Sequence, residues 1–341
     1  MGKAVIAGVI LVAGIAGAVW FGGHGSGDGT VELLNVSYDP TRELWRDLNA
    51  AFIPHYEQET GTRLTIKQSH AASASQARAV IDGLDADVVT LALWSDTDAI
   101  RRQGLIADGW EERFPHRALP YFSTIVFVVR KGNPRAIKDW PDLVQPGVKV
   151  ITPNPKTSGN GKLSFLAAWA AVVQRGGSPT DAQEYVGKLY RQVPVLDTGA
   201  RGATTTFAQK QIGDVHLTWE SEAYLEVQES GGALEIVYPP VSIRAEPQVA
   251  VVDANVERKH TREAAQAYLQ FLYTAAGQEI IARHYYRPID AAVLAKHQAR
   301  FPPLKLVPIT AVARDWDDAQ AQFFAEGGVF DQIYLARGKG R

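Results

Sequence analysis

Short apolar runs alternate with longer amphipathic stretches along most of the chain from Val31 onward. Runs rich in β-branched residues predict strands, and the longer stretches between them predict helices. Predicted strands cover 31–37, 63–69, 87–93, 123–129, 148–152, 193–197, 214–219, 235–240 and 247–253. The alternation predicts an α/β fold whose sheets are mainly parallel and flanked by helices.

Helices are predicted after several strands and through the last third of the chain. We expect Asp39 to cap a helix that has Pro40 in its first turn. The apolar run 163–173 is too long for a strand and reads as a helix. The segment 261–285 predicts one long amphipathic helix, and 317–328 predicts a shorter one.

A length of 341 residues predicts two domains rather than one. Connecting strands near 119–125 and 240–250 would join two α/β lobes and leave a cleft between them. The expected boundaries are 30–120 with 247–341 for lobe 1, and 121–246 for lobe 2. Ligands of open α/β sheets bind at the carboxyl ends of the strands, so the cleft is the expected site.

The first 21 residues predict export rather than part of the fold. Lys3 precedes an uncharged apolar run, 4–21, which is typical of a signal peptide or a membrane anchor. Ala16-Gly17-Ala18 fits a cleavage site, whereas Trp20-Phe21 fits the interfacial end of a spanning helix, so both interpretations stay open. Residues 22–29 form a glycine-rich spacer. Either interpretation places the body of the protein in the periplasm.

Composition excludes several classes of function. A formal net charge of -2 and the absence of a basic cluster argue against nucleic-acid binding. The chain has no cysteine, which removes disulfides, thiol chemistry and a lipid-modified N-terminal cysteine. Its eight histidines lack metal-ligand spacing, so we predict no metal and no cofactor. His70 lies nearest to the candidate loops, and we expect a surface role for it as for the other histidines.

Four short loops that follow predicted strands and precede predicted helices carry the candidate chemistry. They are 37–41 (SYDPT), 69–75 (SHAASAS), 154–162 (NPKTSGNGK) and 197–206 (DTGARGATTT). A helix start leaves backbone N–H groups without partners and carries partial positive charge. Glycine and small residues let an anion approach those groups. Four such loops predict an anion site.

Two more specific sequence motifs, the nucleotide P-loop and the nucleophile elbow, do not match these loops. A nucleotide P-loop ending at Gly161-Lys162 would need glycine at Lys156 and a hydroxyl at Leu163. No nucleophile-elbow motif surrounds Ser73 or Ser158, which argues against a catalytic serine.

Three other side chains near these loops remain ambiguous. Lys156 and Arg201 are expected to stabilise the loops or pair with carboxylates rather than bind a ligand. For Trp219, core packing and donation of the indole N–H both remain open.

At these residues the chain resembles the sulfate- and thiosulfate-binding proteins of bacterial ABC importers. The matching blocks span 31–333 and occur in the family's order. They are NVSYDPTRE (35–43), QSH (68–70) with Ser73, NPKTSG (154–159), LDTGARG (196–202), the WE of LTWE (217–220), YRPID (286–290) and FDQI (330–333). The resemblance implies a two-lobed, type II periplasmic binding protein that closes on its ligand and is not an enzyme.

The resemblance also implies the ligand donors. Backbone N–H groups are implied for Asp39, Gly159, Asn160 and Ala200, hydroxyl or backbone groups for Ser73 and Ser158, and the indole N–H for Trp219. Neutral fixed donors can hold a dianion without a counter-cation. Donors alone also disfavour phosphate, which keeps a proton at neutral pH and needs an acceptor.

The chain departs from the family pattern at four small residues. Alanine replaces glycine at Ala71, Ala72 and Ala74, and Asn160 replaces a second glycine after Ser-Gly. If the Asn160 backbone requires a positive φ, asparagine tolerates it well. Sulfate is the expected ligand, with thiosulfate as the alternative.

The expected role is that of a monomeric receptor that delivers the anion to an inner-membrane ABC permease. One alternative is a membrane-tethered oxyanion sensor or scavenger, which depends on residues 1–21 remaining attached. A second is an esterase acting on sulfate or phosphate esters. The lack of metal ligands and of a nucleophile–base set argues against the second alternative.

Overall fold

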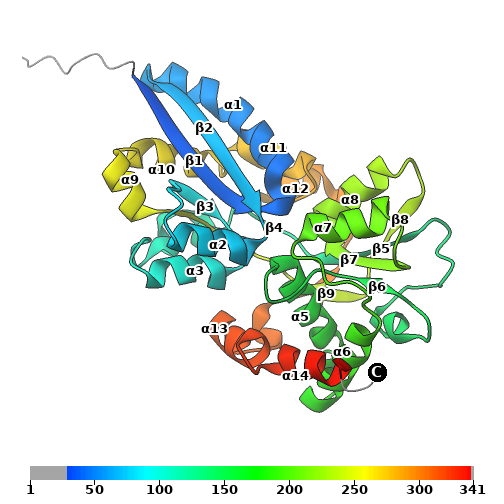
Figure 1. Cartoon of the computed structure of the whole chain (residues 1–341). Coiled ribbons are helices and arrows are strands. Elements are labelled where there is room, and N and C mark those ends of the chain that lie inside the picture. The colour runs from blue at the N-terminus through cyan, green and yellow to red at the C-terminus, as the bar shows by residue number, and fades with distance from the viewer. Residues whose placement is uncertain (1–28, 339–341) are drawn as a thin grey trace, which may run out of the picture.

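The computed structural model describes residues 29–338, which form two α/β lobes that lie side by side (Figure 1). Each lobe has a four-stranded sheet and a large buried apolar core. The predicted two-lobed α/β class is therefore confirmed. Predictions for residues 1–28, including the signal or anchor, lie outside the described residues.

The first lobe contains a sheet of order β10-β3-β1-β2. β1 (Thr30–Tyr38), β2 (Arg63–Ala71) and β3 (Val88–Thr90) are parallel, whereas β10 (Val249–Val251) is antiparallel to β3. Its helices are α1 (Arg42–Thr60), α2 (Ser73–Ile81), α3 (Trp94–Arg102), α4 (Pro115–Ala118), α9 (Asp253–Lys259), α10 (Arg262–Phe271), α11 (Ala275–Arg283) and α12 (Ala291–Lys296). The predicted long helix 261–285 is thus two helices, because α10 ends at Phe271 and Thr274 caps α11.

The second lobe contains a mixed sheet of order β6-β7-β5-β8. Its strands are β5 (Ile125–Arg130), β6 (Val150–Ile151), β7 (Val215–Trp219) and β8 (Leu234–Val237). β5 is antiparallel to both β7 and β8, so the prediction of a mainly parallel sheet is wrong for this lobe. β5 enters directly from the first lobe without a crossover helix, and its direction is set by its pairing with β7 and β8, which are distant in sequence.

Helices of the second lobe surround this sheet and provide two of the four loops. They are α5 (Gly159–Val173), α6 (Pro179–Arg191), α7 (Ala200–Thr204) and α8 (Glu220–Glu229). The segment 193–197, predicted as a strand, is an extended connection that joins no sheet. α5 is apolar around most of its surface and is buried almost throughout. This central helix holds the loop 154–162 against the sheet.

Three segments connect the lobes, one more than predicted. The first leaves β4 (Tyr121–Phe122), and Ser123 pairs there with Ala245 of the second, between β9 (Val241–Ile243) and β10. The third follows α12 and enters β12 (Lys305–Val307), which is parallel to β9. β11 (Arg287–Pro288) pairs with β4 at this hinge.

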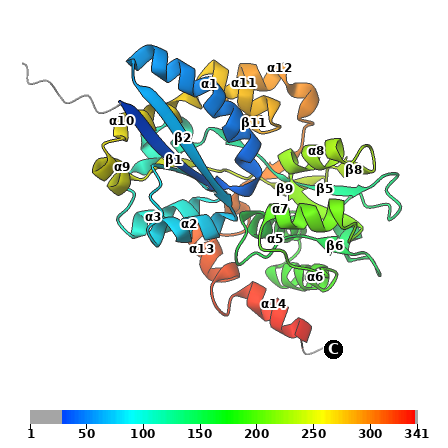
Figure 2. The ribbon, with the colours of Figure 1, turned by 45° about the horizontal axis from the view of Figure 1, so that its top comes forward.

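The C-terminal residues pack on the second lobe. α13 (Trp316–Ala319), a π-helical turn (Gln320–Phe324) and α14 (Val329–Gly338) follow β12, and Figure 2 shows α14 beside α6. Phe323, Phe324 and Phe330 join the core that contains α5. This packing differs from the expected boundary, which placed 247–341 wholly in lobe 1. The aromatic face of this segment needs the apolar surface of α5 and α6.

No helix within residues 29–338 is long and apolar enough to cross a membrane.

Candidate functional site

The four predicted loops converge on one small cavity between the lobes. All seven predicted site residues line it: Asp39, Ser73, Ser158, Gly159, Asn160, Ala200 and Trp219. Tyr38, Pro40, Ala72 and Ala92 complete the wall. The structure therefore brings together every residue that the sequence placed at the site.

Two helix starts of the first lobe supply potential donors. Asp39 begins a short 3-10 helix, η1 (Asp39–Thr41), directly after β1, and Ser73 begins α2 after β2. Residues at these positions have backbone N–H groups without intrahelical acceptors. The expectation that Asp39 caps a helix is wrong, because Tyr38 holds the cap position and the Asp39 side chain makes no capping bond.

The Ser73 hydroxyl is already used within the first lobe. It donates to Asp96 Oδ2 at 2.6 Å and accepts from the Ala92 N–H at 2.9 Å. A ligand therefore meets the backbone N–H of Ser73 rather than its hydroxyl. The hydroxyl instead fixes the start of α2 against the loop that follows β3.

The start of α5 supplies three donors from the second lobe. The N–H of Ser158 donates to the Asn154 carbonyl at 2.9 Å, and its hydroxyl caps the helix by accepting from the Gly161 N–H at 3.4 Å. The hydroxyl proton of Ser158 is left for a ligand. The N–H groups of Gly159 and Asn160, in the first turn, are also left because no intrahelical acceptor precedes them.

Ala200 and Trp219 complete the set in the second lobe. Ala200 is the first residue of α7 and is nearly fully buried. Trp219 ends β7, is fully buried, and its ring centroid lies 5.2 Å from that of Tyr38. The indole thus both packs in the core and lines the cavity, so the two roles left open for Trp219 are compatible.

Two glycines of the second lobe allow the lobes to approach closely. A Cβ on Gly159 would lie 2.4 Å from the Ala92 Cβ, and one on Gly199 would lie 2.6 Å from Asp39 Oδ2. The Ala92 contact is the stricter one because its Cβ cannot rotate away. The closed cleft therefore depends on the absence of a side chain at Gly159.

Lys156 and Arg201 bind protein groups, as expected. Lys156 Nζ donates to the carbonyls of Phe324 and Ala325 and pairs with Asp331 at 2.7 Å. Arg201 pairs with Glu43 across the cleft at 2.6 Å and with Glu222 at 2.9 Å. Neither cation lines the cavity. The ligand would thus face neutral donors rather than a counter-cation.

Carboxylates near the site have raised pKa values because they are buried. Burial raises the pKa of Asp39, and Arg42 and Arg201 oppose that rise. Burial also raises the pKa of Glu222 to about 8, although Arg201 again opposes it. Arg201 is therefore needed to balance the surrounding carboxylates, which leaves it less free to balance a bound anion.

The expected surface role is wrong for His70 and His216. His70 is half-buried, with Nδ1 2.8 Å from Ser37 Oγ and Nε2 2.7 Å from Gln68 Oε1, and burial lowers its pKa to about 4. His216 is fully buried on β7 and lies 2.8 Å from Glu226. Neither histidine lines the cavity. The ring of each histidine contacts side chains of the protein instead.

The substitutions relative to the family pattern fit ordinary backbone geometry. Asn160 is helical and Ala72 has φ of -57°, so neither position requires the positive φ that favours glycine. The Asn160 side chain donates to the Leu217 carbonyl at 3.3 Å and contacts Ser164. Asn160 thus ties the start of α5 to β7 and leaves its backbone N–H for the cavity.

Tyr38, Pro40 and Ala92 were missed as wall residues. Tyr38 and Pro40 flank Asp39, so the loop itself was the available signal. Ala92 follows β3, which is shorter than the predicted strand 87–93 because the chain turns into α3 there. No sequence pattern distinguishes Ala92 from a core alanine.

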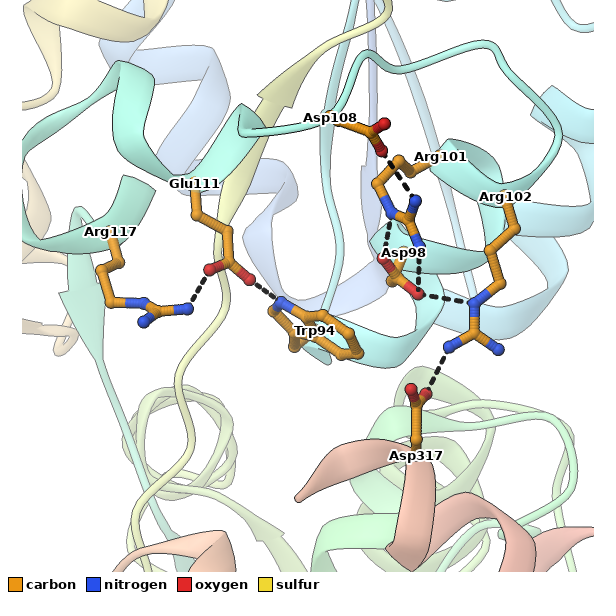
Figure 3. Close-up of polar contacts among 8 residues, drawn as sticks. All are labelled: Trp94, Asp98, Arg101, Arg102, Asp108, Glu111, Arg117 and Asp317. Carbon is orange, nitrogen blue, oxygen red and sulfur yellow. Dashed lines mark hydrogen bonds and ion pairs between the residues drawn. The ribbon is translucent and has the colours of Figure 1, made fainter.

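Charged contacts also bridge the lobes at the edge of the cleft. Arg102 of α3 binds Asp98 at 2.7 Å within the first lobe and Asp317 of α13 at 2.6 Å (Figure 3). Nearby, Glu111 accepts from the indole of Trp94 and from Arg117. Deeper in the cleft, Lys162 of α5 lies 3.5 Å from Asp96 of α3. Cations in this region pair with carboxylates of the chain.

Comparisons with known proteins agree with this architecture. The family model for bacterial extracellular solute-binding proteins matches residues 45–287. A sulfate-binding protein from Escherichia coli (strain K12) is 53% identical over 89% of this chain and 93% of its own length. A thiosulfate-binding protein from Pseudomonas aeruginosa (strain PAO1) is 51% identical over 89% of this chain and 92% of its own length.

Solved structures agree as well. The sulfate-binding protein SubI from Mycobacterium tuberculosis H37Rv superposes with a TM-score of 0.78 at 32% identity, covering 86% of this chain and 99% of that one. A periplasmic thiamin binding protein at 19% identity shares the fold with a TM-score of 0.59, covering 83% of this chain and 95% of its own. The chain belongs to the bacterial extracellular solute-binding proteins. Within that class it groups with the sulfate- and thiosulfate-binding proteins.

Proposed function

We propose that this protein binds sulfate in the interlobe cavity and delivers it to an ABC permease of the inner membrane, with thiosulfate as the alternative ligand. The observation that carries the proposal is the meeting of all seven predicted donor residues around one small cavity. Relatives named for sulfate and thiosulfate binding support the choice of anion. Their names describe binding proteins, which supports a receptor rather than an esterase.

The cavity is suited to an oxyanion that carries no proton. Backbone N–H groups of Asp39, Ser73, Gly159, Asn160 and Ala200, the Ser158 hydroxyl and the Trp219 indole are all donors. Six of these lie at the starts of four helices, which add favourable partial charge. A protonated oxyanion would place an O–H against N–H groups and leave a buried donor unpaired, which can cost about 10⁴-fold in discrimination.

Contacts made from both lobes explain how binding would drive closure. Asp39 and Ser73 come from the first lobe, and the other five residues come from the second. An anion that bonds to both sets favours the closed form by the free energy of the second set of bonds. The permease would then distinguish the loaded receptor by its closed shape.

A competition experiment on the wild-type protein tests the proposal. Calorimetric titrations with sulfate, thiosulfate, molybdate and phosphate at neutral pH should show tight sulfate or thiosulfate binding and phosphate weaker by about 10⁴-fold. Phosphate binding equal to that of sulfate would overturn selection by donors alone. Failure to bind any of the four anions would overturn the function.

The N-terminal segment decides whether the receptor is free in the periplasm or tethered. We infer export from the apolar run 4–21, through either a cleaved signal or a retained anchor. Intact-mass measurement of the exported protein separates the two outcomes. Loss of residues 1–18 would remove the case for a tethered sensor or scavenger. Sedimentation of the same sample would test the expected monomer.

A further inference from the structure

Two adjacent residues at the hinge each contact a segment that lines the cavity. One segment belongs to the first lobe and the other to the second. Tyr286 precedes β11, and its hydroxyl donates to the Pro40 carbonyl at 2.9 Å, next to Asp39. Arg287, within β11, binds Glu220 in a bidentate pair at 2.7 and 2.8 Å, next to Trp219. Neither residue lines the cavity. Their contacts therefore act on the residues that do.

The Glu220–Arg287 pair secures the carboxyl end of β7. The Glu220 side chain is fully buried and that of Arg287 is 8% exposed. The Arg287 guanidinium also donates to the Pro302 carbonyl at 3.0 Å, on the third connection between the lobes. The Glu220 N–H donates at 3.0 Å to the Thr124 carbonyl, on the first connection. The residue after Trp219 is thus attached to two of the three hinge segments.

An aromatic cluster links the same residues beneath the cavity. The Tyr286 ring lies 4.7 Å from that of Tyr121 in β4, and the Tyr121 and Tyr38 hydroxyls are 3.4 Å apart. Tyr38 in turn packs against Trp219. All four side chains are almost completely buried. Hinge strands and ligand loops therefore form one continuous packed unit.

We propose that Tyr286 and Arg287 are positioning residues for the anion site, holding the Asp39–Pro40 loop and the Trp219–Glu220 corner in register across the hinge. The proposal rests on the proposed function. Tyr286 fixes the first-lobe donor at Asp39, whereas Arg287 acts through Glu220 on the Trp219 indole. Anion binding by the two lobes is coupled because both loops are fixed to adjacent residues of the hinge.

Tyr286→Phe tests the first arm of the proposal, the positioning of the Asp39–Pro40 loop by Tyr286. It keeps the aromatic ring and leaves the Glu220–Arg287 pair intact. We expect sulfate affinity to fall about 3- to 10-fold, because the freed Pro40 carbonyl no longer orients the loop. Tyr190→Phe is the matched control, since Tyr190 is also buried and its hydroxyl has no partner within residues 29–338. The control should bind sulfate as tightly as wild type. Equal affinity of Tyr286→Phe and wild type would overturn this arm.

The double variant Glu220→Gln/Arg287→Met tests the second arm of the proposal, the action of Arg287 through Glu220 on Trp219. It removes both charges, so no unpaired buried charge is left. We expect about 10-fold weaker sulfate binding in protein shown to be folded by circular dichroism. In a Trp219→Phe background the same change should cost less than about 2-fold, because its target is absent. Tyr286→Phe should keep its full effect in that background. An unchanged loss in both backgrounds would assign the pair a structural role only.

The controls separate this proposal from the function on which it rests. Wild-type protein that binds none of the four anions contradicts the function itself. Wild-type protein that binds sulfate, with Tyr286→Phe and the double variant binding equally well, contradicts only the positioning role. If the double variant does not fold, Tyr286→Phe decides the question by itself.

Discussion

The cavity and the charged contacts around it use opposite chemistry in the same cleft. The cavity presents backbone N–H groups, one hydroxyl and one indole from helix starts and a strand end. Outside it, cations such as Lys162 and Arg201 pair with carboxylates of the facing lobe. The formal charges thus neutralise one another, and the anion is left to neutral donors.

This difference has consequences for geometry as well as for charge. Neutral donors select only if they are fixed, and here they are fixed by Gly159 against Ala92 and by Ser73 against Asp96. The charged contacts at the outer edge, such as Arg102 with Asp317, are about half-exposed. Exposed ion pairs contribute little free energy. Substitutions in the cavity should therefore matter more than substitutions at the edge.

The largest expected effect comes from Gly159→Ala. The new Cβ would lie 2.4 Å from the Ala92 Cβ, so the lobes could close only by shifting the donors of α5. We expect calorimetry to show about 100-fold weaker sulfate binding, from an overpacking cost near 3 kcal/mol. Gly187→Ala on α6 is the control, since its Cβ would meet only ordinary contacts. Unchanged affinity of Gly159→Ala would show that the lobes need not approach this closely.

Loss of a single donor should have the next largest effect. Trp219→Phe and Ser158→Ala each remove one hydrogen bond to the charged ligand, worth about 1.5–3 kcal/mol or roughly 10- to 100-fold in affinity. Lys156→Ala should change sulfate affinity by less than about 2-fold, because its ammonium binds Asp331 and two carbonyls outside the cavity. Calorimetry on the three variants decides, and equal affinity of the first two and wild type would sink the site assignment.

Most of the site was predictable because each donor loop is local in sequence. A strand, a short hydroxyl- or glycine-rich loop and a helix start can be read without knowledge of the partner strands, and this pattern located the four loops. The resemblance to the sulfate- and thiosulfate-binding proteins then selected individual residues such as Asp39, Ser158 and Ala200. Chemistry that depends on contacts across the cleft was not predictable. The close approach of Gly159 to Ala92 joins residues from different lobes, and no spacing in the chain encodes it.

The fold was likewise predictable where it depends on local sequence patterns, and not where it depends on contacts between distant segments. β-branched runs located β1, β2, β5 and β7, but the direction of β5 depends on the pairing of strands that are distant in sequence. The third connection between the lobes carries no signal of its own, so the C-terminal helices were assigned to the wrong lobe. Their aromatic residues are buried against α5, and no local pattern encodes that choice of partner.

A pH effect at His70 tests whether its imidazole stays neutral beside the cavity. Burial lowers the pKa of His70 to about 4 from an ordinary value of 6.5. Between these pH values the unfolded chain binds a proton that the folded chain does not, so stability falls as pH drops from about 6.5 to 4. His70→Gln should reduce this slope in urea titrations at pH 7 and pH 5. An identical slope in the variant would show that the pKa of His70 is not lowered in the fold.

The smallest expected effect is at the exposed contact between the lobes. Asp317→Asn removes the contact with Arg102 but leaves Arg102 bound to Asp98, so no buried charge loses its partners (Figure 3). Both side chains are about half-exposed, and such pairs contribute roughly 0–1 kcal/mol. We expect calorimetry to show sulfate affinity within about 3-fold of wild type at low salt, and less difference at high salt where the pair is screened.

Asp82→Asn provides the control for that measurement, because Asp82 is a similarly exposed partner of Arg78 at the end of α2 and spans no cleft. A loss beyond 10-fold in Asp317→Asn alone would contradict the comparison, since the closed form would then depend on charge at its edge. If sulfate affinity falls by less than 3-fold in both variants, the closed form is stabilised mainly by the anion and by the packed contacts at Gly159. In that case the ion pairs across the cleft serve chiefly to keep their own charges away from the ligand.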